Sequence, residues 1–157
     1  MAGDETSPDD SSPARLRRGN TADVPAVLAL WVDAGTHRTS TDDTDAVKGL
    51  VARDHEALLI AEIDGRMVGT LIAGWDGWRG NLYRLAVVPD VRRRGIAAAL
   101  VAEAERRFRS LGCRRVTALV VDADPHAVEF WTAVGYEPYP MKRYVRTLGA
   151  TAGASSW

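Results

Sequence analysis

Hydrophobic residues in the middle of the chain fall into three short runs that are separated by turn residues. Runs of this length, bounded by glycine and aspartate, are typical of strands. The first two runs are separated by Asp64-Gly65, which is a strong signal for a two-residue hairpin turn. We therefore predict three consecutive antiparallel strands, at residues 57–63, 66–75 and 81–88.

Elsewhere apolar residues recur every three or four positions, which is the period of an amphipathic helix. The clearest case has Ile96, Leu100, Val101, Ala104, Phe108 and Leu111 on one face. Asn20 or Thr21 can cap an earlier helix, and Asp124 followed by Pro125 can begin the last one. These patterns predict helices at residues 21–34, 45–54, 96–111 and 125–134.

The remaining apolar stretches complete a mixed α/β fold. They predict strands at residues 14–18 and 115–121, the second long enough to be buried on both faces, and a strand or hairpin at residues 136–148. A chain of 157 residues fits one domain, which we place at residues 14–148. Its polar ends, residues 1–13 and 149–157, predict a disordered N-terminal tail and a flexible C-terminal tail.

The loop between the strand ending at Val88 and the helix from Ile96 carries the main chemical signal. It contains three consecutive arginines and Gly95, just before a helix start whose N–H groups have no intrahelical partner. This combination indicates an anion site, most plausibly for phosphate. It lacks the Gly-Lys-Ser/Thr of a Walker loop and the further glycines of a dinucleotide fingerprint. A solvated charge run is the simpler alternative.

Charge and composition exclude several partners. The net charge is −1, so nothing in the overall charge favours nucleic acid. The N-terminus is acidic rather than signal-like, and no apolar run approaches the roughly 18 residues of a membrane span. Cys113 is the only cysteine, which suits a reducing cytoplasm, and the three histidines share no metal-ligand spacing. We expect a cytoplasmic protein without a metal.

Two motifs, in this order, resemble those of the GCN5-related N-acetyltransferases. Arg92-Arg93-Arg94-Gly95-Ile96-Ala97 matches the family's Arg/Gln-x-x-Gly-x-Gly/Ala loop, and AVEFWTAVGYEPY at residues 127–139 matches its Ala-x-x-Phe-Tyr…Gly-Phe helix. The likeness covers residues 14–148. It implies a twisted, mostly antiparallel sheet with flanking helices, in which the strands ending near Val88 and Val121 run parallel and splay apart to admit a cofactor.

The resemblance also implies an acetyl-coenzyme A (acetyl-CoA) site. In the family the loop amides hold the pyrophosphate, the strand before the loop pairs with the pantetheine arm, and the last helix packs along the cofactor. A helix start carries about half a positive charge, which agrees with this role. Asp124 replaces the family's asparagine and is first of all a helix cap. The residues assigned to acetyl-CoA are Leu85, Ala86, Val87, Val88, Arg92, Arg93, Arg94, Gly95, Ile96, Ala97, Ala98, Asp124 and Phe130.

The chain departs from the family at the positions that handle protons. Trp131 stands where many members have a tyrosine acid, and an indole N–H donates only a hydrogen bond. Tyr83 stands near the position of the family's glutamate base. Strand alternation predicts that Tyr83 shares a face with Leu85 and Val87, so its phenol is our first candidate for proton transfer. Tyr136 is the second candidate, and Tyr139 a weaker one.

Large aromatic residues point to an acceptor site. Trp75 and Trp78 flank a turn, and together with Trp31 they can wall the acceptor cleft or form a dimer face. Asp76 can attract a cationic amine. We assign Trp31, Trp75 and Asp76 to substrate binding.

The function we predict is acetyl transfer from acetyl-CoA to a primary amine of a small molecule or a protein, by direct attack of the amine. The alternative is a catalytically weak sensor or scaffold that binds acyl-CoA, because both proton-handling positions are altered. Family members often dimerise, so a homodimer is a further expectation.

Overall fold

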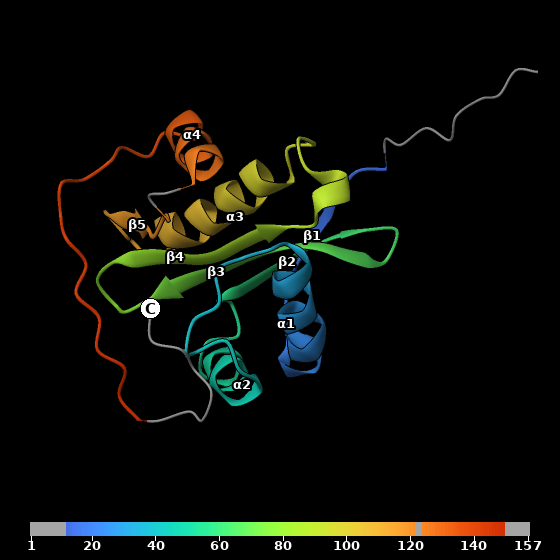
Figure 1. Ribbon diagram of the computed structural model, residues 1–157, viewed down its shortest axis with the longest axis horizontal. Helices are drawn as coiled ribbons and strands as arrows, with labels where there is room; N and C mark the ends of the chain where they lie inside the picture. The colour runs from blue at the N-terminus through green and yellow to red at the C-terminus, as the bar shows by residue number, and fades with distance from the viewer. Residues whose placement is uncertain (1–11, 122–123, 150–157) are drawn as a thin grey trace, which may run out of the picture.

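The computed structural model of the protein describes residues 12–121 and 124–149, and Figure 1 shows its arrangement. Five strands form one sheet in the order β1-β2-β3-β4-β5. The strands are β1 Arg15–Arg18, β2 Leu58–Ile63, β3 Arg66–Trp75, β4 Gly80–Val87 and β5 Val116–Ala118. The helices are η1 Thr21–Asp23, α1 Val24–Asp33, α2 Thr44–Arg53, η2 Pro89–Val91, α3 Ile96–Ser110 and α4 Pro125–Ala133.

Helices cover both faces of the sheet. In Figure 1, α1 and α2 lie on one side of the sheet, and α3 and α4 lie on the other. A Cβ atom built on Gly69 would lie 3.2 Å from side-chain atoms of Ile96 and Leu100, so α3 packs directly on β3. On the opposite face Trp31 of α1 reaches Thr70 of β3. The core therefore has two layers, one on each side of the central strands.

The central hairpin and the helix boundaries follow local sequence signals. Asp64 and Gly65 have φ angles of 49° and 77°, as a tight turn between two strands requires. The Asn20 side chain accepts a hydrogen bond from the Ala22 amide at 2.9 Å and caps the first helical segment. The predicted hairpin is confirmed, and the predicted helices agree with α1, α2, α3 and α4 to within a few residues.

The two parallel strands diverge. β4 and β5 pair only at Gly80–Val116, Asn81–Thr117 and Leu82–Ala118, after which β5 ends while β4 continues to Val87. Within the described residues, the second half of β4 therefore has an open edge on this side. The predicted splayed parallel pair is confirmed. The prediction of a long, doubly buried strand at residues 115–121 is wrong, because β5 has three residues and all are half-buried.

A bulge interrupts β4 and changes which face its side chains occupy. Tyr83 lies opposite Ile72, and Ala86 lies opposite Thr70, so two β4 residues stand opposite Leu71 alone. Arg84 adopts a positive φ of 56° at this point. Tyr83 therefore faces α1 and α2 together with Ala86, whereas Val87 pairs with Gly69 and faces α3. The prediction that Tyr83 shares a face with Val87 is wrong.

The segment after α4 is extended and exposed. In Figure 1 it leaves α4, passes around the β5 side of the sheet and ends on the side of α2. No strand is formed within residues 136–149, so the predicted strand or hairpin is wrong for the described part of the chain. The Arg115 guanidinium lies 4.8 Å from the centre of the Tyr139 ring, which joins this segment to the residue just before β5. The predicted tails fall almost wholly outside the described residues.

Candidate active site

The loop at residues 89–95, which we call the arginine loop, presents free backbone donors at the start of α3. Arg93 and Gly95 both have positive φ angles, 66° and 77°, and Gly95 directly precedes the first helical residue. The first hydrogen bond into the helix runs from the Ala99 amide to the Gly95 carbonyl at 3.0 Å. The N–H groups of residues 96–98 thus have no acceptor among the described residues, as expected for a first helical turn. Three donors and the positive helix end lie together here.

Three arginines brace this loop or lie beside it. Arg92 donates through Nε to the Val87 carbonyl at 3.0 Å and through Nη2 to the Ala34 carbonyl at 2.8 Å. It therefore ties the loop to the end of β4 and to the end of α1. Arg94 donates to the Ser12 carbonyl at 3.1 Å. Arg66 holds the Asp90 carboxylate of η2 through two hydrogen bonds of 2.7 and 3.1 Å.

Arg93 differs from these three residues. Its side chain is exposed and has no hydrogen-bond or ion-pair partner among residues 12–121 and 124–149. From the sequence the three arginines of the loop cannot be told apart, but in the structure their side chains make different contacts. Arg92 is a brace, whereas the Arg93 side chain is exposed beside the free amides of the loop.

The open edge of β4 adjoins the loop. The Val88 amide donates to the Val68 carbonyl of β3 at 2.9 Å, so the preceding Val87 carbonyl points to the opposite, open edge. There it is held by Arg92.

The apolar residues assigned to acetyl-CoA before and after the loop differ in burial. Three are buried, three are half-buried and one is exposed: respectively Ala86, Val88 and Ile96; Leu85, Val87 and Ala97; and Ala98. Free amides, positive charge and an unpaired strand edge fit a ligand that carries a pyrophosphate and a chain of amides.

Tyr83 lies on the face that carries α1 and α2. Its side chain is 39% exposed, and a Cβ atom on Gly74 would lie 3.2 Å from its ring. Burial raises the pKa of the phenol, the Arg143 charge lowers the pKa, and the Asp76 charge raises it further. The phenol therefore remains protonated at neutral pH. Arg143 comes from the extended C-terminal segment, which brings that segment close to this residue.

The predicted acceptor residues have different surroundings. The Asp76 carboxylate accepts hydrogen bonds from the Arg79 amide at 2.6 Å and the Trp78 amide at 2.8 Å, and these bonds lower its pKa. Trp75 is half-buried, while Trp78 is 70% exposed and stacks on the Arg79 guanidinium at 3.9 Å. Asp76 thus organises a turn and keeps its negative charge.

Trp31 is a core residue. It is 4% exposed, and its Nε1 donates to Thr70 Oγ1 at 2.9 Å. Such burial leaves little surface for direct contact with an acceptor. The structure places it instead beneath Arg84, whose guanidinium lies 5.0 Å from the centre of its ring. Sequence reasoning missed Arg84, because neither Tyr83 nor Leu85 signals a bulge.

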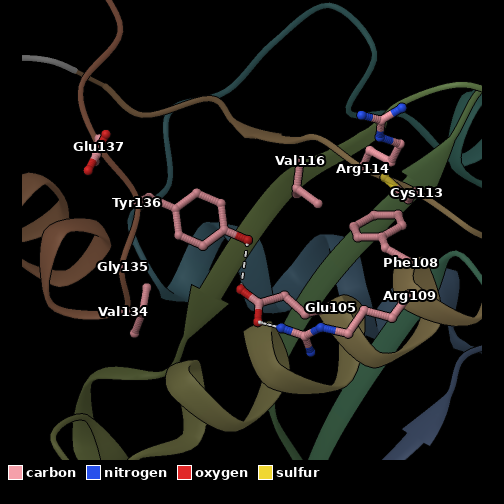
Figure 2. A pocket seen from close by; sticks show the side chains of 10 residues that line it. All are labelled: Glu105, Phe108, Arg109, Cys113, Arg114, Val116, Val134, Gly135, Tyr136 and Glu137. Carbon is pink, nitrogen blue, oxygen red and sulfur yellow. Dashed lines mark hydrogen bonds and ion pairs between the residues drawn. The ribbon is translucent and has the colours of Figure 1, made fainter.

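Tyr136 lies on the other face of the sheet, in a separate pocket. As Figure 2 shows, its hydroxyl points toward Glu105 of α3, to which it donates a hydrogen bond of 3.0 Å. Burial and the Glu105 carboxylate raise the pKa of this phenol. The cavity measures about 400 Å³ and lies toward the C-terminal end of α3, away from the arginine loop. The structure therefore does not bring Tyr136 and Tyr83 together.

The last helix begins at a capping aspartate. Asp124 Oδ1 accepts from the His126 amide at 3.0 Å and from the Ala127 amide at 3.2 Å. Phe130 is half-buried and packs edge-on against Trp131, with ring centroids 5.3 Å apart. Trp131 in turn packs against Tyr136 at 5.0 Å. The tryptophan in the family's tyrosine position is 8% exposed, and these contacts are packing contacts.

Among the described residues, no three His, Cys, Asp or Glu side chains are grouped in a way that could hold a metal ion. In the same part of the chain, every helix is too short or too polar to cross a bilayer.

Comparison with known proteins identifies the family. Residues 24–136 match the model of the acetyltransferase (GNAT) family. An acetyltransferase of Pectobacterium atrosepticum is 32% identical over 115 residues, covering 73% of this chain and 82% of that protein. One from Yersinia enterocolitica is 31% identical over 116 residues, covering 74% and 82%.

Solved structures agree in fold. The structure of AAC(6′)-Iy in complex with a CoA-S-monomethyl-acetylneamine bisubstrate analogue has a TM-score of 0.70 at 21% identity, over 88% of this chain and 100% of that chain. The PaiA N-acetyltransferase from Thermoplasma acidophilum, in complex with coenzyme A, has a TM-score of 0.72 at 13% identity, over 83% and 93%. With the family model and the curated relatives in agreement, this chain belongs to the GNAT family of acetyltransferases.

Proposed function

We propose that the protein transfers an acetyl group from acetyl-CoA to a primary amine. The observation that carries this proposal is the juxtaposition of three free amides at the start of α3 with the open edge of β4. Such a site suits a pyrophosphate that is joined to an amide-bearing arm. AAC(6′)-Iy, which shares the fold, forms a complex with an analogue that joins coenzyme A to an acetylated amine, and this supports an amine acceptor.

We assign different parts of the cosubstrate to different groups around the loop. The amides of residues 96–98 and the Arg93 side chain hold the pyrophosphate, while Arg92 keeps the loop in place. The open edge of β4 holds the pantetheine arm. Acetyl-CoA supplies the activated acetyl group as a thioester. Holding both reactants in a fixed orientation accounts for much of the rate, up to roughly 7–11 kcal/mol in favourable cases.

Tyr83 is the group that we assign to proton transfer. Like any tyrosine phenol it is protonated at neutral pH, and burial raises its pKa further, so it can give a proton to the departing thiolate. Tyr136 donates a hydrogen bond to Glu105 on the opposite face of the sheet, so we assign it no role in proton transfer. The acceptor amine has to be neutral to react, and we expect the rate to rise with pH through its deprotonation.

The test combines binding and turnover. We would titrate the protein with acetyl-CoA by calorimetry and measure acetylation of an aminoglycoside, spermidine and a peptide with a free N-terminus. Tyr83→Phe should keep the affinity for acetyl-CoA and lower kcat by at least about tenfold. Tyr144→Phe is the matched control, since Tyr144 is 90% exposed.

The outcomes separate enzyme from sensor. Turnover that falls only in Tyr83→Phe supports the assignment. Equal turnover in both variants refutes the role of Tyr83. Tight binding of acetyl-CoA without acetylation of any amine favours the sensor or scaffold, which the tryptophan at position 131 already suggests.

A further inference from the structure

The guanidinium of Arg84 joins the sheet to the connector between α1 and α2, residues 35–43. Nε donates to Asp42 Oδ1 at 2.9 Å, Nη1 donates to the His37 carbonyl at 2.6 Å, and Nη2 lies 3.4 Å from Thr39 Oγ1. The side chains of Arg84 and Asp42 form an ion pair and are 13% and 9% exposed. One side chain thus contacts three points of the same connector.

The backbone of Arg84 is fixed as firmly as its side chain. The Arg84 carbonyl accepts from Thr70 Oγ1 at 3.3 Å, and Thr70 itself is fully buried and accepts from Trp31. The guanidinium lies over the Trp31 ring. Arginine rarely adopts a φ of 56°, and here the bulge, the buried hydroxyl and the ion pair maintain it together.

Within residues 12–121 and 124–149, the hydrogen bonds of Arg84 attach the connector to the bulge. The connector's other hydrogen bonds at Thr39 and Asp42 are local, with the Thr39 amide donating to Asp42 Oδ2 at 2.6 Å and the Asp42 amide donating to the Thr39 carbonyl at 3.1 Å. Arg84 directly follows Tyr83, which faces the same side of the sheet. The connector is therefore held over the face that carries the candidate proton donor.

We propose that Arg84 is a positioning residue for the amine acceptor: by fixing the connector beside Tyr83, it shapes the acceptor side of the site and leaves the acetyl-CoA side unaffected. This inference rests on the proposed function. Arg84 does not act on the reacting atoms, because its donors are directed at the connector. The arginine loop, which we assign to acetyl-CoA, is braced independently of Arg84, by Arg92 and Arg66.

The experiment compares Arg84→Met with a matched control, Arg107→Met. Arg107 is also a largely buried arginine paired with an aspartate: it holds Asp54 at the end of α2 through bonds of 2.7 and 2.8 Å. None of its hydrogen-bond partners among the described residues lies in the connector. For each variant we would measure hydrogen–deuterium exchange of residues 36–43, the dissociation constant for acetyl-CoA, and KM and kcat for the amine with the highest turnover in the panel. Asp42→Asn weakens the same contact from the connector side, should Arg84→Met fail to fold.

We expect Arg84→Met to exchange faster in residues 36–43 and to raise KM for the amine at least about tenfold, with acetyl-CoA affinity within about twofold of wild type. Arg84→Lys should recover only part of the effect, because an ammonium cannot serve the three acceptors in a planar fork. Arg107→Met should lower the melting temperature and leave KM and connector exchange unchanged.

Three results would overturn the inference: an unchanged KM in Arg84→Met, unchanged exchange of the connector, or an equal rise of KM in Arg107→Met. If the wild-type protein acetylates no amine, the proposed function fails, and the acceptor role of Arg84 fails with it. The exchange data still show in that case whether Arg84 holds the connector, so the two failures are distinguishable.

Discussion

Gly95 and Gly112 offer a matched pair of substitutions at the two ends of α3. Both have positive φ, 77° and 74°, and a Cβ atom on either would meet no other atom within 4 Å. Alanine at each position should therefore cost about the same, roughly 1–2 kcal/mol of backbone strain. For a chain of this size we expect a loss of about 2–8 °C in melting temperature in both variants.

The two variants should differ in acetyl-CoA binding. At Gly95 either the loop amides reorient or a methyl group enters the space from which the pyrophosphate approaches. Loss of one hydrogen bond to a charged group, about 1.5–3 kcal/mol, corresponds to an affinity lower by about 10- to 150-fold. Gly112→Ala should bind acetyl-CoA like the wild type. Calorimetric titration and thermal melts measure both quantities, and equal dissociation constants in the two variants would refute the loop as the pyrophosphate site.

Two further predictions concern the turn and the start of β4. A Cβ atom on Gly80 would lie 2.9 Å from three ring atoms of the buried Phe108. Gly80→Ala should therefore lower the free energy of unfolding in urea by about 1–3 kcal/mol, and adding Phe108→Leu in the same chain should recover part of this loss. An unchanged free energy of unfolding in Gly80→Ala would show that the ring can move aside. The pKa of Asp76 is lowered by backbone amides in the folded state, so its stabilising effect is present above the unfolded pKa and is lost as pH falls through the folded pKa. Asp76→Asn should therefore lose less stability than the wild type between about pH 5 and pH 2, and identical acid-side slopes would contradict this.

The parts of the fold that the sequence predicted are those whose signals are local. Asp64-Gly65 can form the tight turn without help from distant residues, and Asp124 caps the helix that it precedes. The conformation of the arginine loop belongs to this class as well, because Gly95 and the helix start are neighbours in sequence. The two signature motifs also indicated the family, which the matching family model and the relatives support.

What could not be predicted depends on contacts between distant segments. No glycine or asparagine in the sequence signals the bulge at Arg84. The bulge is maintained by Thr70 of β3, Trp31 of α1 and Asp42 of the connector. The simple alternation of a strand therefore placed Val87 on the wrong face. In the same way, the role of Arg92 as a brace depends on the Ala34 carbonyl, 58 residues away in the chain.

The shortness of β5 has a consequence for solubility. β5 is the last strand of the sheet, and its outer edge has no partner strand among the described residues. An open edge is a template on which a second molecule can add a strand and begin aggregation. With three residues β5 offers few backbone groups for this, and the exposed Arg114 and Arg115 that precede it repel the same edge of another copy. The early end of β5, which leaves the edge of β4 open, thus also limits the growth of a sheet between molecules.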